Sequence, residues 1–318
     1  MKILKRRLWA LIKERFSIRV DLIGNGNLLG IFTGGYIYAT IPCYSWSEKK
    51  PTINEQGSIQ IESVDYADNF VDFDLQNNRI ELSVTPDKLY QGDVVYLLYL
   101  LFTKILQEAG YFLVHGSSVA FNQRASLFVG PSESGKTIAS LALCLKHGFS
   151  LVSSDMSLLK RERNEILVVG GTKESSMYPG TIEAIFGEKK ARILPEPKAP
   201  WEEKVNVSEA ELNQLGVRYE ENVPLAAIYY LRVQDSFFFR KSLEEVAAKI
   251  KALGLLSEWI RGGNNLVVSA KSLVPSFDTE KAERERLRAL EVISASVRQY
   301  SLYGNLQRVA EFIAAQNM

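Results

Sequence analysis

A chain of 318 residues is long enough for a well-buried core and predicts about two domains, at roughly 150 residues for each. Its 46% hydrophobic and 24% charged residues are typical of a soluble globular protein, and a formal net charge of +1 gives no bulk argument for a nucleic acid or an acidic partner. The two cysteines, Cys43 and Cys144, lack metal-ligand spacing, which argues against a disulfide framework or a zinc site and favours a reducing, cytoplasmic compartment.

The first stretch, MKILKRRLWALIKERF, is rich in lysine and arginine, and its apolar centre LWALI is too short for a signal peptide. We predict a basic amphipathic helix that packs Leu4, Leu8 and Leu11 on its own domain; contact with an anionic membrane surface is the alternative. The most apolar run, VVYLLYLLF at 94–102, is about half as long as a membrane span. We therefore expect no transmembrane segment and interpret this run as part of a core helix.

Residues 18–84 have the pattern of short strands: IRVDLIG, GIFTGGYIYATIP, SIQIESV, FVDFDL and RIELSV. The last two are separated by Gln76-Asn77-Asn78, whose asparagines tolerate the positive φ of a tight turn. These segments predict a small, mostly antiparallel β domain. A helix from about Asp93 to Glu108, ended by Gly110, is expected to close it.

We place the domain boundary after this helix, so that 1–108 form the β domain, with substrate recognition as its candidate role, and 109–318 form a second domain. In the second domain, strands such as RASLFVG, FSLVSSDMSLL, EILVVGG and PLAAIYYLRV alternate with helices such as GKTIASLALCLKHG, SLEEVAAKIKALGLLSEWI and NLQRVAEFIAAQ. This alternation predicts an α/β fold. The segment 186–204, rich in lysine, proline and glutamate, is expected to be a mobile surface loop.

The stretch GPSESGKT matches the phosphate-binding pattern G-x-x-x-x-G-K-[ST] and lies between a strand and an amphipathic helix. Its glycines let backbone N–H groups close on phosphates, and the helix N-terminus adds partial positive charge. Lys136 supplies a cation for the β- and γ-phosphates, and the Thr137 hydroxyl is suited to bind magnesium. The predicted nucleotide-binding residues are Gly130, Pro131, Ser132, Glu133, Ser134, Gly135, Lys136 and Thr137.

Glu133 adds a negative charge to a loop that should bind a triphosphate. The backbone amides of such a loop point inward, so the side chains of its variable positions commonly point outward. We expect the Glu133 carboxylate to face solvent, away from the phosphates. A bond from this carboxylate to a backbone N–H or to a neighbouring cation is the alternative.

Asp155 ends the strand FSLVSSD, one helix, one turn and one strand after Lys136. This short spacing resembles the HPr kinase/phosphorylase and phosphoenolpyruvate carboxykinase group of P-loop proteins. The segment LVHGSSVAFNQRASLFVGPSESGKT is similar to the His-Gly segment, strand and phosphate loop of HPr-kinase-like proteins, and VPLAAIYYLR and VRQYSLYGNLQRVAEFIAA resemble their later strand and closing helix. The resemblance extends over 109–318 and leaves 1–108 without a match.

The resemblance implies a kinase that transfers the γ-phosphoryl group of ATP, with Mg²⁺, to a hydroxyl of a peptide, a protein or a small molecule. Carried over by position, Lys136 and Thr137 hold phosphate and metal, Asp155 is the base or a second metal ligand, and His115 lies near the transferred phosphate. The implied catalytic residues are thus Asp155, His115 and Lys136. HPr kinases assemble as oligomers, so a homo-oligomer is also implied.

One residue departs from the family pattern, because Ser154 stands where its members usually have the first of two adjacent aspartates. This departure motivates the alternative of a nucleotide-binding regulatory or scaffold protein with a lapsed kinase site. Lys173, Glu174 and Arg232 are secondary candidates for the site and are interpreted first as surface residues. His147, at a helix end, is assigned no chemistry.

Overall fold

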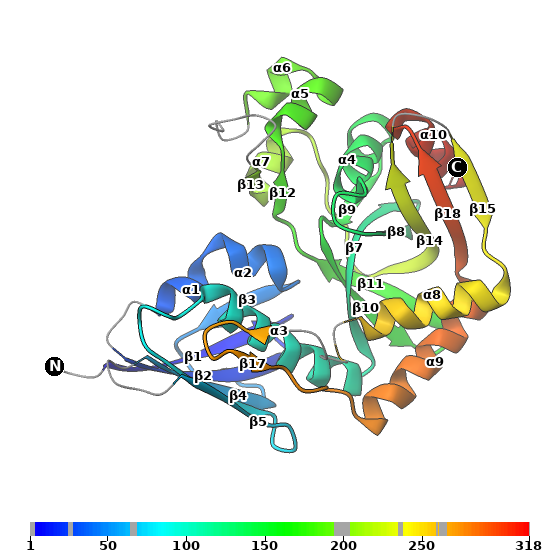
Figure 1. The fold of residues 1–318 in the computed structure, drawn as a ribbon. Coiled ribbons are helices and arrows are strands. Elements are labelled where there is room, and N and C mark those ends of the chain that lie inside the picture. Colours follow the sequence, from blue (N-terminus) through cyan, green and yellow to red (C-terminus); the bar gives the residue numbers. More distant parts are fainter. Residues whose placement is uncertain are drawn as a thin grey trace. The chain divides into compact units, whose positions relative to one another are not determined.

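The computed structural model describes residues 4–24, 28–63, 69–193, 204–234, 238–258, 260 and 266–317 (Figure 1). The chain forms two units. The first unit consists of Met1–Phe112 and Leu256–Arg286, and the second of Leu113–Leu255 and Leu287–Met318. The boundary expected after residue 108 lies near the division at Phe112, but nothing in the sequence pattern indicated that Leu256–Arg286 groups with the first unit.

A six-stranded sheet with the order β3-β1-β2-β4-β6-β5 organises the first unit. The pairs β1–β2, β1–β3 and β5–β6 are antiparallel, whereas β2–β4 and β4–β6 are parallel, so the sheet is mixed. The strands are β1 (Leu4–Ile12), β2 (Phe16–Gly24), β3 (Tyr44–Ser47), β4 (Gly57–Ser63), β5 (Phe70–Asp74) and β6 (Arg79–Val84). Asn78 has the positive φ of 54° expected for the tight turn before β6.

The prediction of a basic helix at the N-terminus was wrong, because this segment forms the β1–β2 hairpin. Lys13 and Glu14, with φ of 50° and 52°, make its turn. Leu8, Ala10 and Ile12 are buried at the two-residue spacing of a strand, and β1 pairs with neighbours on both sides. Pairing with β2 and β3 therefore outweighs the helical spacing of the leucines. The alternative of a membrane contact was based on that amphipathic helix, which the structure does not contain.

A second correction concerns GIFTGGYIYATIP, which forms two short helices, α1 (Leu29–Thr33) and α2 (Gly35–Thr40), in place of the expected strand. Its β-branched and aromatic residues favour a strand locally. However, Ile31 and Phe32 of α1 and Ile37 of α2 are buried within the first unit, so packing of these side chains decides the conformation. Tertiary packing commonly overrides such local preferences.

The expected core helix is present as α3 (Gln91–Glu108), whose apolar residues are almost all buried. Gly110, with φ of 78°, follows its last turn as predicted. Within the part of the chain that the structure describes, no helix is long and apolar enough to cross a membrane.

Polar contacts along α3 bind the later segment Leu256–Arg286 to the first unit. The buried carboxylate of Asp93 accepts hydrogen bonds from the backbone N–H groups of Val268 (3.1 Å) and Ser269 (2.6 Å). Near the other end of α3, Gln107 accepts a hydrogen bond from the buried Arg286 guanidinium at 2.7 Å. A buried polar group is costly without such a partner, so these bonds hold the returning segment in place.

The second unit contains an eight-stranded mixed sheet with the order β11-β10-β7-β8-β14-β18-β15, in which β9 also pairs with β7 and β11 also pairs with β14. The strand β14 runs parallel to both β8 and β18. The strands are β7 (Tyr111–Phe121), β8 (Arg124–Val129), β9 (Ser150–Ser153), β10 (Met156–Glu162), β11 (Glu165–Gly171), β14 (Val223–Val233), β15 (Phe239–Ser242) and β18 (Arg298–Gly304). With its helices, the protein is a mixed α/β structure.

Helices α4 (Lys136–His147) and α10 (Leu306–Asn317) contact each other and bury apolar residues in the core of this unit (Figure 1). The helix α9 (Glu280–Ser296) was not anticipated from the sequence. The other elements are α5 (Pro179–Phe186), α6 (Glu188–Ala191), α7 (Glu209–Gln214), α8 (Glu245–Ser257) and the strand pairs β12 (Ser175–Met177) with β13 (Val205–Val207) and β16 (Leu266–Val267) with β17 (Ser272–Leu273).

Two segments differ from the structure that the sequence predicted for them. FSLVSSDMSLL forms two strands, β9 and β10, with Ser154 and Asp155 in the break between them. Part of the expected loop 186–204 is helical, as α6, and its residues 194–203 lie outside the described part of the chain.

Candidate functional site

The predicted phosphate-binding loop (Gly130–Thr137) connects β8 to α4 within the second unit. β8 lies between β7 and β14 in the sheet and is parallel to β14. The loop therefore follows the carboxyl end of an interior strand, which is the usual ligand-binding edge of a parallel sheet. Lys136 is the first residue of α4, so the helix N-terminus and its partial positive charge face this loop.

Both motif glycines are required by close backbone packing against β14. A Cβ on Gly135, which has φ of 90°, would lie 2.5 Å from Cβ of Val233. A Cβ on Gly130 would lie 2.6 Å from the carbonyl oxygen of Leu231. The N–H of Val233 also donates a 2.7 Å hydrogen bond to the carbonyl of Ser134. The end of β14 thus fixes the shape of the loop from one side.

Lys136 lies across the loop, where its ammonium group donates to the carbonyl oxygens of Gly130 and Pro131, both at 3.0 Å. The residue is only 5% exposed. The buried Ser134 hydroxyl has no hydrogen-bond partner among the described residues. A glycine cradle, a held cation and an unsatisfied hydroxyl fit a phosphate group, whose oxygens are suitable acceptors for these donors.

The exposed Glu133 points to a cation outside the loop. Its Oε1 lies 3.3 Å from Nζ of Lys204 and accepts a 3.3 Å hydrogen bond from the hydroxyl of Tyr178. The Lys204 ammonium also lies over the Tyr178 ring, 5.0 Å from its centre. Glu133 has φ of 63°, a left-handed conformation that is uncommon for a residue with a side chain. Sequence reasoning identified neither Tyr178 nor Lys204, because neither lies near the motif in sequence.

Thr137, the second residue of α4, contacts the break between β9 and β10. Its hydroxyl donates a 3.4 Å hydrogen bond to the backbone carbonyl of Ser154. Asp155, the next residue, has Oδ1 3.3 Å from Nε2 of His115, which belongs to β7. The structure therefore brings together three predicted residues, Thr137, Asp155 and His115, from three separate segments. Asp155 is 46% and His115 25% exposed, so both side chains are accessible.

Ser154 is buried and its hydroxyl is committed to the neighbouring backbone. It donates to the carbonyl of Thr172 at 3.0 Å and also contacts the carbonyl of Glu174. The Thr172 hydroxyl in turn accepts hydrogen bonds from the N–H groups of Asp155 (3.1 Å) and Met156 (3.0 Å). Ser154 and Thr172 together shape the break between β9 and β10 that presents Asp155. Thr172 was not identified from the sequence, which offered no local signal for it.

Buried serines lie beneath the same residues. Ser140 of α4 donates to the carbonyl of Lys136 at 3.0 Å and contacts the hydroxyl of Ser117 on β7. Ser117 donates to the carbonyl of Ser153 at 3.0 Å. These bonds connect the start of α4 with the end of β9, where Asp155 follows.

The secondary candidates have other partners. Lys173 pairs with Glu209 (3.4 Å) and Glu221 (3.6 Å); burial opposes its charge, but these carboxylates raise its pKa. Partial burial, followed by repulsion from Glu211, raises the pKa of Glu174. Arg232 is exposed on β14, and His147 is the last residue of α4.

A magnesium ion would depend on few protein ligands at this site. Among the described residues, no three or more His, Cys, Asp or Glu side chains are grouped so that they could hold a metal. Mg²⁺ usually keeps several waters and binds substrate phosphates with only one or two carboxylates. Thr137 contacts the backbone of Ser154, and Asp155 follows Ser154 in the sequence. These two side chains fit this limited role.

Comparisons with known proteins give little similarity. No family model and no curated protein matches the chain. One solved structure with partial similarity is the HPr(Ser) kinase/phosphatase from Coxiella burnetii, at 11% identity and a TM-score of 0.29 over 64% of this chain and 91% of that chain. A similarity of this size shows neither a common fold nor a common activity, so a functional proposal has to rest on the residues of the site.

Proposed function

We propose that this protein is an ATP-dependent kinase that transfers the γ-phosphoryl group to a hydroxyl of a peptide, a protein or a small molecule. The observation that carries the proposal is the meeting of the phosphate-binding loop with the Asp155–His115 pair, through the hydrogen bond from Thr137 to the carbonyl of Ser154. A loop that holds phosphate next to an accessible carboxylate is the minimum that phosphoryl transfer requires.

Each residue has a proposed role, and Asp155 has two. The loop amides and Lys136 bind and neutralise the phosphates, and Thr137 with Asp155 would hold Mg²⁺, which supplies further charge neutralisation when it is bound. Asp155 accepts the proton of the acceptor hydroxyl as its oxygen forms a bond to the γ-phosphorus and the bond from phosphorus to the bridging oxygen of ADP breaks. His115, 3.3 Å away, orients the Asp155 carboxylate.

A second candidate is a nucleotide-binding regulatory or scaffold protein whose kinase site has lapsed. It is favoured by Ser154, which replaces a carboxylate of the resembled family and spends its hydroxyl on backbone carbonyls. This candidate predicts nucleotide binding without transfer. For the first unit, we retain the proposal that it recognises the acceptor.

The kinase proposal is tested by incubating the full chain with γ-labelled ATP, Mg²⁺ and a panel of serine-containing peptides and small polyols. Lys136→Ala and Asp155→Asn serve as the variants. Label transferred by the wild type and by neither variant supports the kinase. Asp155→Asn is expected to retain ATP binding, because this residue does not belong to the loop that holds the phosphates.

Tight ATP binding by the wild type without transfer to any acceptor would favour the regulatory protein. Unchanged ATP affinity in Lys136→Ala would contradict the assignment of the phosphate-binding loop, and both candidates with it. Arg124→Ala, a substitution of an exposed cation at the end of β8 that lies away from the loop, is a control for nonspecific loss of positive charge.

A further inference from the structure

The basic run at the N-terminus lies in the first part of β1, before the pairing with β3 begins at Trp9, and the proposed kinase site does not use it. β1 pairs with β2 so that Lys5 is opposite Ile23 and Arg7 is opposite Asp21. β2 pairs with β4 so that Asp21 is opposite Gln60. Side chains at alternate positions share one face of a sheet, so these five residues project from the same face. Leu8 and Val20, at positions of opposite parity, are buried.

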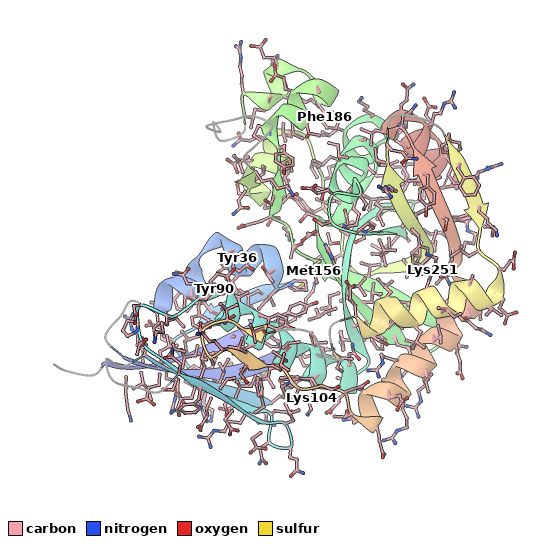
Figure 2. The ribbon with its side chains drawn as sticks, viewed as in Figure 1. Tyr36, Tyr90, Lys104, Met156, Phe186 and Lys251 are labelled. Carbon is pink, nitrogen blue, oxygen red and sulfur yellow. The ribbon has the colours of Figure 1, made fainter. Side chains whose placement is uncertain are left out.

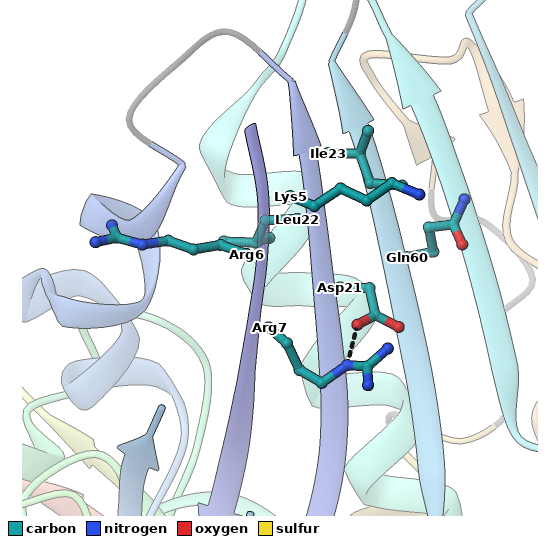
Figure 3. A pocket seen from close by; sticks show the side chains of 7 residues that line it. All are labelled: Lys5, Arg6, Arg7, Asp21, Leu22, Ile23 and Gln60. Atoms are coloured by element: carbon teal, nitrogen blue, oxygen red, sulfur yellow. Dashed lines mark hydrogen bonds and ion pairs between the residues drawn. The ribbon is translucent and has the colours of Figure 1, made fainter. Parts of the chain in front are cut away.

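This face has a surface pocket of about 310 Å³ (Figure 3), lined by Lys5, Arg6, Arg7, Asp21, Leu22, Ile23 and Gln60. Its volume is at the lower end of the range for pockets that bind small ligands. Figure 3 shows the Lys5 side chain extending over β2 towards Gln60, with the Arg7 guanidinium beside Asp21. Donor groups from neighbouring strands therefore surround the space, and Ile23 adds an apolar wall.

Asp21 holds the Arg7 guanidinium by one edge. Nε of Arg7 donates to Oδ1 of Asp21 at 2.6 Å, and Nε of Arg19 donates to Oδ2 at 3.0 Å. Both carboxylate oxygens are thus occupied by arginines. Because Arg7 binds Asp21 through Nε, its two terminal nitrogens remain available as donors. Among the described residues, no hydrogen bond is formed by these nitrogens, by the Lys5 ammonium or by the Gln60 amide. The pocket has several donors, and the carboxylate of Asp21 is already bound by two arginines.

The charges on this face are also unevenly distributed. Lys5, Arg7 and Arg19 lie on β1 and β2, and Asp21 is the carboxylate on these two strands. Glu62 of β4 lies opposite Ile23 on the same face, and Glu55 pairs with Arg19 at 2.8 Å. On the far strands β5 and β6 the carboxylates predominate, with Asp72 opposite Glu81 and Asp74 opposite Arg79. The cations of this face are therefore concentrated on β1 and β2, and an anionic ligand would be repelled from β5 and β6.

We propose that this pocket binds an anionic group, a carboxylate or a phosphate, through Lys5, Arg7 and Gln60. A planar guanidinium fixed by Asp21 presents two parallel N–H donors, which suits both anions, and Lys5 adds a point charge. The anionic group is carried either by a small molecule or by an acidic peptide. The inference concerns the first unit alone and does not rest on the proposed kinase activity.

The test is an NMR titration of the isotope-labelled full chain with inorganic phosphate, succinate and a hexaglutamate peptide, each in turn. Amide shifts of residues 5–7, 21–23 and 60 report on the pocket, and those of 130–137 report on the phosphate-binding loop. The same titrations on Lys136→Ala remove the loop as a competing phosphate site. A hexalysine peptide controls for nonspecific peptide binding.

The double variant Lys5→Gln/Arg7→Gln should lower the affinity of the pocket by about tenfold or more, since it removes two charged donors. Arg19 continues to pair with Asp21 in this variant, so no buried charge is left alone. Arg79→Gln is on the same sheet but outside the pocket, and its affinity for the anion should stay within about twofold of the wild-type affinity. Circular dichroism melts of all variants confirm that each is folded.

Saturable shifts in the pocket that survive Lys136→Ala and disappear in the double variant support the proposal. A preference for hexaglutamate identifies an acidic peptide as the source, and a preference for phosphate or succinate identifies a small anion. Absence of saturable shifts at residues 5–7 with all three probes would overturn it. Equal affinity of the wild type and the double variant would do the same. Loss of ATP binding or phosphoryl transfer bears on the other unit and leaves this result unaffected.

Discussion

Glu133 of the phosphate-binding loop pairs with Lys204, which directly precedes β13, with 3.3 Å between Oε1 and Nζ. The two side chains are 64% and 36% exposed, so solvent screens the pair and its contribution to stability is small. Its importance lies elsewhere. The pair offsets a negative charge in a loop whose proposed ligand is itself strongly negative.

Removal of that charge should strengthen nucleotide binding. We expect Glu133→Gln, which keeps the size of the side chain, to raise ATP affinity about threefold, a difference of ~0.6 kcal/mol. Lys204→Gln should lower the affinity to a similar extent, and the double variant should lie near the wild type. Isothermal titration calorimetry in low salt and in high salt checks the cause, because screening should reduce all the differences. Weaker binding by Glu133→Gln would mean that Glu133 contacts the bound nucleotide or its metal directly.

Gly135 and Gly148 form a matched pair, since both have positive φ, 90° and 75°, but only one is crowded. A Cβ on Gly135 meets Val233 at 2.5 Å, whereas a Cβ on Gly148 has no heavy atom within 4 Å. Gly148→Ala should therefore cost about 1 kcal/mol, the usual strain of a left-handed residue. Gly135→Ala should cost about 3 kcal/mol and abolish ATP binding, because overpacking adds to that strain.

Urea unfolding measures the stability of both variants, and ATP titration measures their affinity for ATP. In a Val233→Gly background, which removes both the Cβ and the Cγ2 atom that a Cβ on Gly135 would meet, Gly135→Ala should cost less stability than it does in the wild type. Equal destabilisation in the two single variants would contradict the close packing of the loop against β14.

Glu174 predicts a pH dependence whose sign follows from its environment. Partial burial and then repulsion from Glu211 raise its pKa above the ordinary value of 4.5, so the folded state binds this proton more tightly than the unfolded state. Stability from this group is complete below pH 4.5 and is lost as the pH rises through the folded-state pKa. Glu174→Gln should therefore melt at a higher temperature than the wild type at pH 7 and at nearly the same temperature at pH 4.

Differential scanning calorimetry at these two pH values measures the effect. Glu183→Gln, on the exposed surface of α5, reports the general effect of removing one negative charge. A melting temperature of Glu174→Gln below that of the wild type at pH 7 would show that the carboxylate is stabilised, and not destabilised, by its surroundings.

The sequence was sufficient to predict those features that depend on residues close together in the chain. The spacing Gly130, Gly135 and Lys136 together with the apolar face of α4 predicted a loop and helix that the structure contains. The hairpin turn at Asn78 and the end of α3 at Gly110 were predicted for the same reason, since glycine and asparagine favour positive φ. These features depend on a few adjacent residues.

The features that were missed depend on residues far apart in the chain. β1 is a strand because β2 and β3 pair with it on both sides, which no local helix propensity reveals. The break before Asp155 is shaped by Thr172, and the partner of Glu133 is Lys204. Predicting any of these contacts from one sequence requires the register of the sheet in advance.

Substitutions of Ser154 distinguish the two candidate functions proposed for the site. The hydroxyl of this serine donates to backbone carbonyls in a buried position, with 1% of the residue exposed. An aspartate there would place a carboxylate against the carbonyl oxygens of Thr172 and Glu174, which cannot donate to it. We expect Ser154→Asp to destabilise the protein by about 3 kcal/mol and to leave phosphoryl transfer unimproved.

Ser154→Ala is the matched control, because it removes the hydroxyl without adding charge and should cost about 1 kcal/mol. It should also keep most of any transfer activity, since the N–H groups of Asp155 and Met156 still donate to Thr172. Chemical unfolding and the labelled-ATP assay on both variants give the result. A stable Ser154→Asp variant with increased phosphoryl transfer would mean that the serine reduces kinase activity, as the second candidate function predicts. Loss of stability without gain of transfer would identify Ser154 as a residue that stabilises the strand break at Asp155.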